Sequence, residues 1–341
     1  MMSTEIIATS LEGVRRRVKP AIEAELQRYV NAAEEAGLAE MQHMLRFHLG
    51  WEGPGAGDKA TGKRIRPLLV LLSCEAAGGA WQAALPAAAA VELLHNFSLI
   101  HDDIQDNSRT RRGRPTLWAQ WGVAQAINAG DALFALAHVA LEDLEDAVYP
   151  QAAKLLPRVS LELTQGQYLD LAYEDKPDLD ASAYWPMVRG KTAVLLSACT
   201  RLGALVAGAR DAQLSEYAHF GEKLGLAFQV YDDLLGIWGD EALTGKSAHS
   251  DLVSGKKSLP VLYALGRSEE FARRWNNGKI AAEEVADLAA LLEAAGARQY
   301  VEGEARRLTK EALEALERAQ PAAEATAALR ELAEELVTRE A

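Results

Sequence analysis

The stretch Ala87 to Asp106 reads AAAAVELLHNFSLIHDDIQD and is apolar on almost every side until its aspartates begin. A helix that is apolar all round belongs in the centre of a protein. We therefore do not expect its acidic end to be an ordinary solvated face. The aspartates also follow the C-terminal end of the helix, where the dipole disfavours carboxylates unless a cation compensates them. The stretch predicts a buried helix that ends in a charged site.

The rest of the chain also favours helices. Ala, Leu, Glu and Arg dominate its long segments, and no alternating polar and apolar stretch bounded by Asn-Gly or Asp-Gly turns is found. The breaks between helical blocks are short, no linker is biased enough to mark a domain boundary, and no repeat of solenoid period is visible. We predict an all-α fold that forms a single domain over residues 1–341.

The amino-acid composition narrows the classes of function that the protein can have. The chain has 49 acidic against 36 basic residues, a net charge of −13, which argues against a general binder of nucleic acid or anionic membranes. The longest apolar runs, such as Leu68–Leu72 and Val194–Ala198, fall short of the roughly 20 residues that span a bilayer. Two distant cysteines, Cys74 and Cys199, suggest neither a zinc site nor a disulfide framework. We expect a cytoplasmic protein without stable membrane insertion.

Three aspartates at the end of this helix, Asp102, Asp103 and Asp106, form the motif DDIQD. On a helix, Asp102 and Asp106 lie one turn apart, with about 5–6 Å between their Cβ atoms. Two carboxylates that close repel each other, so the pair makes sense if a hard cation such as Mg²⁺ bridges them. The alternative is an exposed helix end that is acidic without a function.

Basic clusters accompany this motif and a second one. Arginines follow in the segment RTRRGRP, residues 109–115, and the segment GKRIRP, residues 62–67, opens another apolar helix. The stretch QVYDDLLG, residues 229–236, repeats paired aspartates and is followed by Lys246, Lys256 and Lys257. Guanidinium groups and helix N-termini bind phosphate oxygens. A structural salt-bridge network could use some of these residues, but the repetition favours magnesium together with more than one diphosphate-like group.

These segments, in this order, resemble the trans-isoprenyl diphosphate synthases, or polyprenyl synthetases. The resemblance rests on GKRIRP, ELLHNFSLIHDDIQDNSRTRRGRPT, the GKT of residues 190–192, FQVYDDLLGIWGD and the later TGK, SDL and GKKS, and it covers about residues 62–260. The short-chain geranylgeranyl and farnesyl diphosphate synthases are the most similar members. One isolated DDxxD would be weak evidence, whereas the ordered set is specific.

The resemblance implies a large helical bundle of the isoprenoid synthase type around a central active-site cavity, in a chain that is commonly a homodimer. It implies three Mg²⁺ held by Asp102 and Asp106 on one wall and Asp232 on the other, with Asp103 and Asp233 as supporting carboxylates. It also implies that basic side chains bind the two substrates. The allylic diphosphate would contact Arg111, Lys191 and Lys246; isopentenyl diphosphate would contact Lys63, Arg66, His95 and Arg112; Lys256 would also bind substrate, and Thr192 and Gln229 would lie beside the reacting carbons.

By composition alone, His95 would more simply be a hydrogen-bonded core residue, and only the resemblance assigns it to a substrate. Phe97 and Ser98, five and four residues before the first motif, would help set product length in such an enzyme. A bulky Phe97 beside a small Ser98 resembles the type that forms a C20 product, geranylgeranyl diphosphate. Farnesyl diphosphate and longer products remain alternatives.

One departure from the family pattern affects the function. Gly236 stands where many members have the third aspartate of the second motif, and the next carboxylate on that side is Asp240. This spacing is loosely similar to class I terpene cyclases, which make a first alternative. A cyclase would not need Lys63, Arg66 and Arg112. A regulatory subunit without activity is a second alternative, although such chains usually lose a motif.

Overall fold

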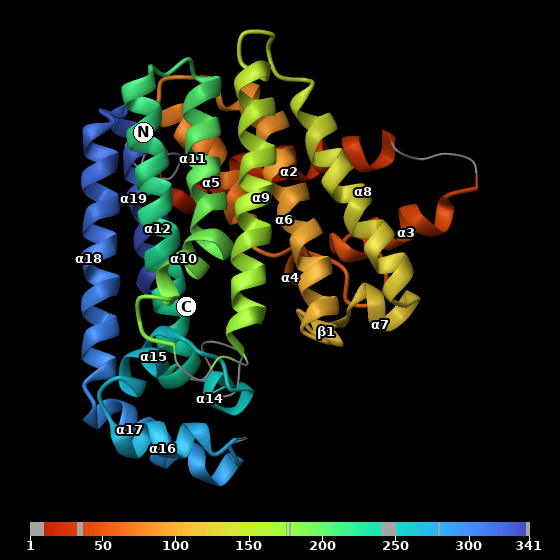
Figure 1. Cartoon of the computed structure of the whole chain (residues 1–341). Helices are drawn as coiled ribbons and strands as arrows, with labels where there is room; N and C mark the ends of the chain where they lie inside the picture. Colours follow the sequence, from red (N-terminus) through yellow and green to blue (C-terminus); the bar gives the residue numbers. More distant parts are fainter. Residues whose placement is uncertain are drawn as a thin grey trace. The chain divides into compact units, whose positions relative to one another are not determined.

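The computed structural model describes residues 10–32, 37–174, 176, 179–239, 250–278 and 280–338 (Figure 1). The all-α prediction is confirmed, and the only strands in these residues are two of two residues each, which pair as a hairpin. The elements are, in chain order, α2 (Leu11–Ala32), α3 (Ala39–His48), α4 (Asp58–Thr61), α5 (Ile65–Ala76), η1 (Trp81–Ala84), α6 (Leu85–Gln105), β1 (Thr110–Arg111), β2 (Arg114–Pro115), α7 (Leu117–Trp121), α8 (Val123–Leu141), α9 (Tyr149–Glu174), α10 (Tyr184–Val188), η2 (Arg189–Ala193), α11 (Val194–Val206), α12 (Asp211–Trp238), α14 (Ser250–Ser254), α15 (Leu259–Leu265), α16 (Glu269–Asn276), η3 (Ala282–Glu284), α17 (Val285–Ala294), α18 (Ala297–Arg318) and α19 (Ala323–Thr338).

The chain contacts divide it into two compact units. The first unit runs to Ser160 and adds Ala198–Tyr217 and Ala319–Leu329. The second unit consists of Leu161–Ser197, Ala218–Arg318 and the residues from Arg330. The first aspartate motif belongs to the first unit and the second motif to the second, so each half of the expected site is described within its own unit.

In the first unit, α6 is the central helix. The alanines Ala87, Ala88, Ala89 and Ala90 are no more than 1% exposed, and α6 packs against α5, α2 and α8. Small alanine side chains allow neighbouring helices to approach closely, and apolar burial is the main stabilising term. The helix ends at Gln105, immediately before Asp106. The predicted buried helix with aspartates at its C-terminal end is therefore present.

Two helical stretches among the described residues, Trp81–Gln105 and Val123–Leu141, are long and apolar enough to span a membrane by length and composition. The most apolar window of the first is 61% buried, as in a core helix of a soluble protein, whereas that of the second is only 33% buried. Val123, Ile127 and Val139 of α8 are 47%, 41% and 45% exposed. Helix α8 thus keeps an apolar face that its own unit does not cover.

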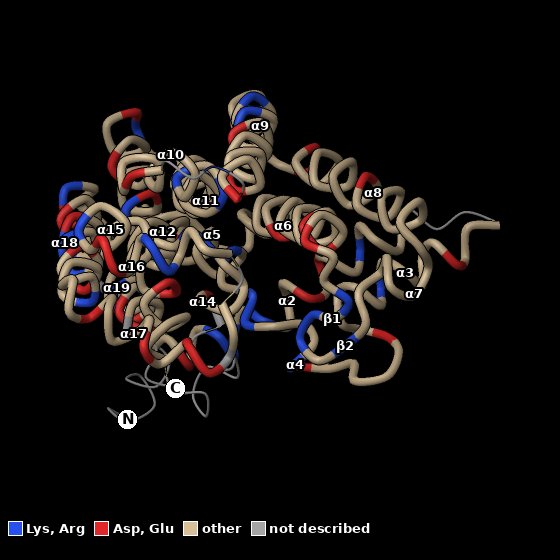
Figure 2. The backbone as a smooth tube through the Cα atoms, turned by 60° about the horizontal axis from the view of Figure 1, so that its bottom comes forward, with Lys and Arg blue, Asp and Glu red and all other residues tan. Residues whose placement is uncertain are grey.

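Basic residues concentrate in one part of the first unit. Figure 2 shows Lys and Arg positions gathered along the backbone at β1, β2 and in the neighbourhood of α4. The hairpin pairs Thr110 with Pro115 and Arg111 with Arg114 in antiparallel register. Gly113 in its turn has φ of +74°, a conformation that side chains rarely adopt. The hairpin therefore holds the arginine segment in a defined position after α6.

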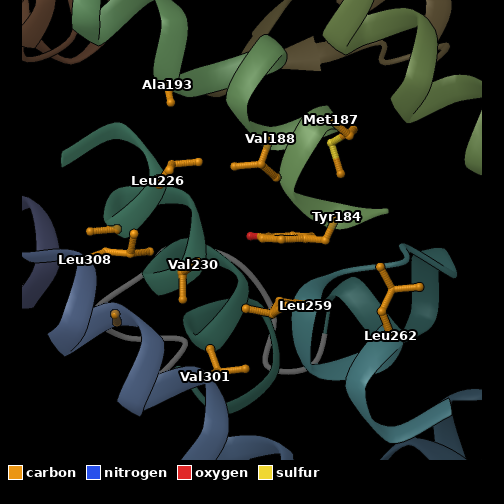
Figure 3. Packing of buried hydrophobic residues seen from close by; sticks show 12 residues of the cluster. Tyr184, Met187, Val188, Ala193, Leu226, Val230, Leu259, Leu262, Val301 and Leu308 are labelled. Carbon is orange, nitrogen blue, oxygen red and sulfur yellow. The ribbon is translucent and has the colours of Figure 1, made fainter. Parts of the chain in front are cut away.

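In the second unit, one buried cluster joins α10, α12, α15 and α18 (Figure 3). Tyr184 of α10 is 1% exposed, and Figure 3 shows its ring pointing toward α12, where Val230 is fully buried. A second cluster is built around Phe271 and Leu292 and joins α15, α16 and α17. These two clusters fix α12, the helix that carries the second aspartate motif, among its neighbours.

Candidate active site

The first aspartate motif lies where α6 ends. The N–H of Asp106 donates to the carbonyl oxygen of Asp102 at 2.8 Å, so the two residues are one helical turn apart, as their spacing predicts. Asp102 is half-buried and Asp106 is exposed, whereas Asp103 is 2% exposed. Nε of Arg111 donates to Oδ1 of Asp103 at 2.9 Å. Burial raises the pKa of Asp103, and the positive charge of Arg111 opposes that rise.

The four arginines of residues 109–115 have different partners. Arg111 pairs with Asp103, and Arg112 donates to the carbonyl oxygen of Ala60 at 2.8 Å. Arg109 lies over the ring of Trp118 at 5.4 Å. Arg114 is buried and donates to the backbone carbonyls of Phe47, near the end of α3, and of Glu52 and Pro54 in the loop that follows. The fork of donors on the guanidinium of Arg114 is thus used to hold backbone.

The segment GKRIRP also separates into different roles. Lys63 is exposed, whereas Arg64 is 4% exposed and pairs with Glu23 at 2.7 Å and Glu92 at 2.8 Å. Arg64 precedes α5 with a left-handed backbone at φ of 47°. Arg66 lies close enough to His95 for a hydrogen bond, with 3.1 Å between Nη1 and Nε2. Arg66 and His95, both predicted to bind one diphosphate, are thus brought together.

The imidazole of His95 is held neutral. Burial and then the charges of Arg66, Arg112 and Arg111 place the pKa of His95 well below its ordinary value. Burial and then the charges of Arg111, Arg112, Arg64 and Arg114 lower the pKa of His48 to about 3. A neutral Nε2 can accept a hydrogen from Arg66, so His95 orients that guanidinium without adding positive charge.

In the second unit, some of the residues predicted around the allylic substrate share one pocket of about 570 Å³, whereas Arg111 belongs to the first unit. The lining of this pocket includes Lys191, Thr192, Gln229, Asp232 and Lys256. Thr192 donates from Oγ1 to Oε1 of Gln229 at 3.0 Å. The predicted grouping of these side chains is therefore present within this unit. Their roles toward substrate stay predictions.

Asp233 lines the same pocket and is a buried acceptor. It is 1% exposed and accepts hydrogen bonds from Nε2 of Gln229 and Nζ of Lys256, both at 3.1 Å. Its other oxygen accepts the backbone N–H of Leu259 at 3.2 Å. With its oxygens so occupied, Asp233 orients its neighbours, whereas Asp232, which also lines the pocket, is half-buried.

The pocket depends on a π-helical turn, η2, which carries the GKT residues. Such turns often occur at functional sites, because they redirect side chains out of the regular helix. Lys191 forms an ion pair with Asp170 of α9. A Cβ on Gly166 of α9 would lie 2.1 Å from the backbone nitrogen of Lys191, and one on Gly190 would lie 2.7 Å from Cα of Gly166. The two glycines allow the helices to meet.

Sequence reasoning missed Gly166 and Asp170. Both belong to the segment LTQGQYLDLAY, residues 163–173, where a glycine inside a strongly helical pattern was the available signal of close packing. Of the predicted residues, Lys246 lies outside the residues that the structure describes, as does Asp240.

The residues predicted to set product length lie on α6. The ring of Phe97 lies 4.7 Å from that of His101 and 5.1 Å from that of Phe134 on α8, measured between centroids. Ser98 donates from Oγ to the carbonyl oxygen of His95 at 2.8 Å. Phe97 therefore fills space between α6 and α8, while the hydroxyl of Ser98 is bonded to its own helix.

The donor chemistry of the aspartates fits magnesium. Asp102, Asp106 and Asp232 present hard carboxylate oxygens, two of them one turn apart. Within the described ranges, no group of three or more His, Cys, Asp or Glu side chains is close enough to hold a metal alone. Mg²⁺ ordinarily takes one or two carboxylates plus waters and substrate phosphates. The arrangement fits ions that are bound together with a diphosphate.

Comparison with known proteins identifies the family. Residues 58–295 match the model of the polyprenyl synthetase family. The chain is 40% identical over 315 residues to a (2E,6E)-farnesyl diphosphate synthase of Mycobacterium tuberculosis, covering 88% of this chain and 87% of that one. It is 46% identical over 232 residues to a geranylgeranyl diphosphate synthase of the same organism, covering 67% and 66%.

Solved structures lead to the same family. A polyprenyl synthetase from Streptomyces coelicolor A3(2) matches with a TM-score of 0.86 at 37% identity, covering 96% of this chain and 98% of that one. A geranylgeranyl pyrophosphate synthase from Corynebacterium glutamicum, complexed with isoprenyl diphosphate and magnesium, matches with a TM-score of 0.83 at 30% identity, covering 94% and 98%. The chain belongs to the polyprenyl synthetase family. It is a prenyltransferase of the short-chain prenyl diphosphate synthase type.

Proposed function

We propose that the protein condenses isopentenyl diphosphate with an allylic diphosphate and forms mainly geranylgeranyl diphosphate. The observation that carries this proposal is the second-unit pocket, where Lys191, Thr192, Gln229, Asp232 and Lys256 come together. Relatives named for both C15 and C20 products support the reaction class and leave the product length to experiment. None of the relatives and structures described above is a terpene cyclase, so that alternative has no support.

In the proposed reaction, Lys191 and Arg111 bind the allylic diphosphate, and Lys63, Arg66 and Arg112 bind the diphosphate of isopentenyl diphosphate. Three magnesium ions, held by Asp102, Asp106 and Asp232, supply positive charge to the departing diphosphate when they are bound.

The allylic C–O bond breaks, the isopentenyl double bond attacks the resulting carbocation, and a proton is lost, which the released diphosphate can accept. Thr192 and Gln229 present polar oxygens to the cationic carbons. The surrounding apolar helices keep water away from the carbocation.

The test is a magnesium-dependent incubation with dimethylallyl, geranyl or farnesyl diphosphate, with and without isopentenyl diphosphate. We expect turnover only with isopentenyl diphosphate and mainly a C20 product. Asp102→Ala and Asp232→Ala should each lower the rate by about a thousandfold or more, because charge stabilisation is the main catalytic term. Asp211→Ala, at an exposed aspartate of α12, is the matched control. Turnover without isopentenyl diphosphate would favour the cyclase, and none in either case would favour the inactive subunit.

We also infer that the protein is a cytoplasmic homodimer. The exposed apolar face of α8, which carries Val123, Ile127 and Val139, supports an interface between two copies. Exposed apolar patches of this kind commonly mark protein–protein contacts. The two buried cysteines are not disulfide-bonded, which agrees with a reducing compartment.

A further inference from the structure

Arg64 has a backbone conformation that residues other than glycine rarely adopt. It stands immediately before α5 with φ of 47° and ψ of 44°, in the left-handed region. A residue with a Cβ is strained in this region, and such residues persist only where the surrounding structure holds them. Arg64 lies between Lys63 and Arg66, which are both predicted to bind the diphosphate of isopentenyl diphosphate. A strained turn thus carries part of that predicted site.

The side chain of Arg64 fixes this turn from inside the first unit. Its Nε and Nη2 donate to the two carboxylate oxygens of Glu23 on α2, at 2.7 and 3.1 Å. Its Nη1 donates to Oε1 of Glu92 on α6 at 2.8 Å, and Nη2 also donates to the carbonyl oxygen of Leu49 at 3.2 Å. The side chains of Arg64 and Glu92 are 2% and 4% exposed. Because all three guanidinium nitrogens donate within the protein, Arg64 anchors the start of α5 to α2 and α6.

The basic residues on either side of this anchor are differently placed. Lys63 is exposed, and Arg66 is half-buried with its Nη1 3.1 Å from Nε2 of His95. Within the part of the chain that the structure describes, the buried Nε of Arg66 has no hydrogen-bond partner. Burial lowers the pKa of Arg66, and the carboxylate of Glu92 opposes that fall. Lys63 and Arg66 thus retain donors for an anion, whereas the donors of Arg64 are used internally.

Arg112 places the arginine hairpin against the same turn. Its Nη1 donates to the carbonyl oxygen of Ala60 at 2.8 Å, and a Cβ built on Gly62 would lie 2.8 Å from its Cζ. Burial and nearby arginines, Arg66 among them, lower the pKa of Arg112, whereas Glu92 opposes that fall. The backbone that Arg64 anchors is therefore also the backbone on which the guanidinium of Arg112 rests.

We propose that Arg64 is the positioning residue of the isopentenyl diphosphate site, and that its ion pairs with Glu23 and Glu92 hold the strained turn in the conformation that presents Lys63 and Arg66 to that diphosphate. Arg64 itself contacts no substrate. A turn that is held before the ligand arrives does not have to be ordered by it, so the anchor raises affinity and leaves the chemical step unchanged. This inference rests on the proposed function, because it takes Lys63 and Arg66 to bind isopentenyl diphosphate.

The test separates the anchor from the strain of the backbone. Arg64→Ala removes the side chain and keeps a Cβ in the left-handed region, whereas Arg64→Gly removes the side chain and relieves the strain. Glu23→Gln weakens the anchor from another helix. Calorimetry gives the Kd of isopentenyl diphosphate without an allylic substrate, and assays give kcat and the KM of both substrates. Leu141→Ala, at a leucine of α8 that is 1% exposed, is the matched control, because it removes packing from the first unit and leaves the anchor intact.

We expect Arg64→Ala and Arg64→Gly each to weaken binding of isopentenyl diphosphate about tenfold, which corresponds to about 1.4 kcal/mol. The KM for isopentenyl diphosphate should rise by a similar factor, while kcat and the KM for geranyl diphosphate should change by less than about threefold. Arg64→Gly should have a higher Tm than Arg64→Ala and bind no more tightly, because relief of strain does not restore the anchor. Glu23→Gln should weaken binding by about threefold, and Leu141→Ala should lower the Tm with the Kd of wild type.

A wild-type Kd in both Arg64 variants would overturn the inference. Equal losses of affinity for the two substrates, or a loss in Leu141→Ala as large as in Arg64→Ala, would also overturn it, since each would show a general effect of lowered stability. If Arg64→Ala does not fold, Arg64→Gly and Glu23→Gln decide by the same criteria. If wild-type protein binds isopentenyl diphosphate but transfers no prenyl group, the proposed function fails while the Kd comparison still tests Arg64. If it does not bind isopentenyl diphosphate, both fail.

Discussion

His48 and His95 are residues whose surroundings determine their protonation. Both are half-buried and lie near arginines of the first unit, and the pKa values of both lie below the ordinary value, about 3 for His48. In the unfolded chain, both imidazoles have a pKa of about 6.5. Between these values the unfolded state binds more protons, so the free energy of unfolding decreases as pH falls below about 6.5.

We therefore predict that the protein loses stability between pH 6.5 and 4.5, by up to about 1.4 kcal/mol per pH unit for each histidine. Denaturant unfolding at a series of pH values measures this slope. His48→Gln should make the slope shallower, whereas His219→Gln, at an exposed position on α12, should leave it unchanged. An equal slope in wild type and His48→Gln would contradict the assigned cause.

Phe97 gives a testable prediction about the length of the prenyl product. Its ring packs against His101 and Phe134 and fills space between α6 and α8. Phe97→Ala should open that space and shift the product toward longer chains, as separated by chromatography of the dephosphorylated alcohols. Stability should fall by about 1–3 kcal/mol, less than for a fully buried phenylalanine. Phe97→Tyr is the control that keeps the ring; an unchanged product in Phe97→Ala would exclude this role.

At the scale of elements, the contact between α9 and η2 depends on two glycines. A Cβ on Gly166 would meet the backbone nitrogen of Lys191 at 2.1 Å, and backbone cannot move aside as a side-chain end can. Gly166→Ala should therefore lower the free energy of unfolding by about 1–3 kcal/mol and disturb Lys191 and Thr192 together.

Calorimetric melting measures the loss, and Gly303→Ala provides the comparison, because the same change in an open helical position should be neutral or slightly stabilising. A Gly166→Ala protein as stable as Gly303→Ala would show that the two helices can separate at little cost. The turn that carries the GKT motif would then not depend on α9.

The contacts between elements also show what could be predicted from the sequence and what could not. The helical spacing of Asp102 and Asp106 is a local property, and it was predicted correctly. The partners of Arg64 and Arg114 were not predictable, because Glu23 and the carbonyl of Pro54 lie 41 and 60 residues away in the chain. A motif shows which side chains are present, but it does not show which of them long-range packing will use.

At the scale of the whole molecule, the exposed face of α8 predicts the oligomeric state. Ile127→Glu and Val139→Glu place charges on that face and should convert a dimer into monomers, as measured by light scattering after gel filtration without detergent. Leu38→Glu, an exposed leucine outside α8, should leave the dimer intact. A wild-type monomer would remove the dimer proposal, and a wild type that needs detergent to stay in solution would point to a membrane instead.

The sequence by itself determined the all-α class, the family, the two aspartate motifs and the residues that accompany them, because helix periodicity and motif order are written along the chain. Tertiary structure alone decided that Arg114 and Arg64 hold loops and helices, that Asp170 pairs with Lys191, and that the guanidinium of Arg112 lies against Gly62. The physical reason is that a charged or small residue takes its role from what folding places against it. Where water is excluded from a contact, an ion pair and the missing Cβ of a glycine both have a larger effect on stability than they would at the surface.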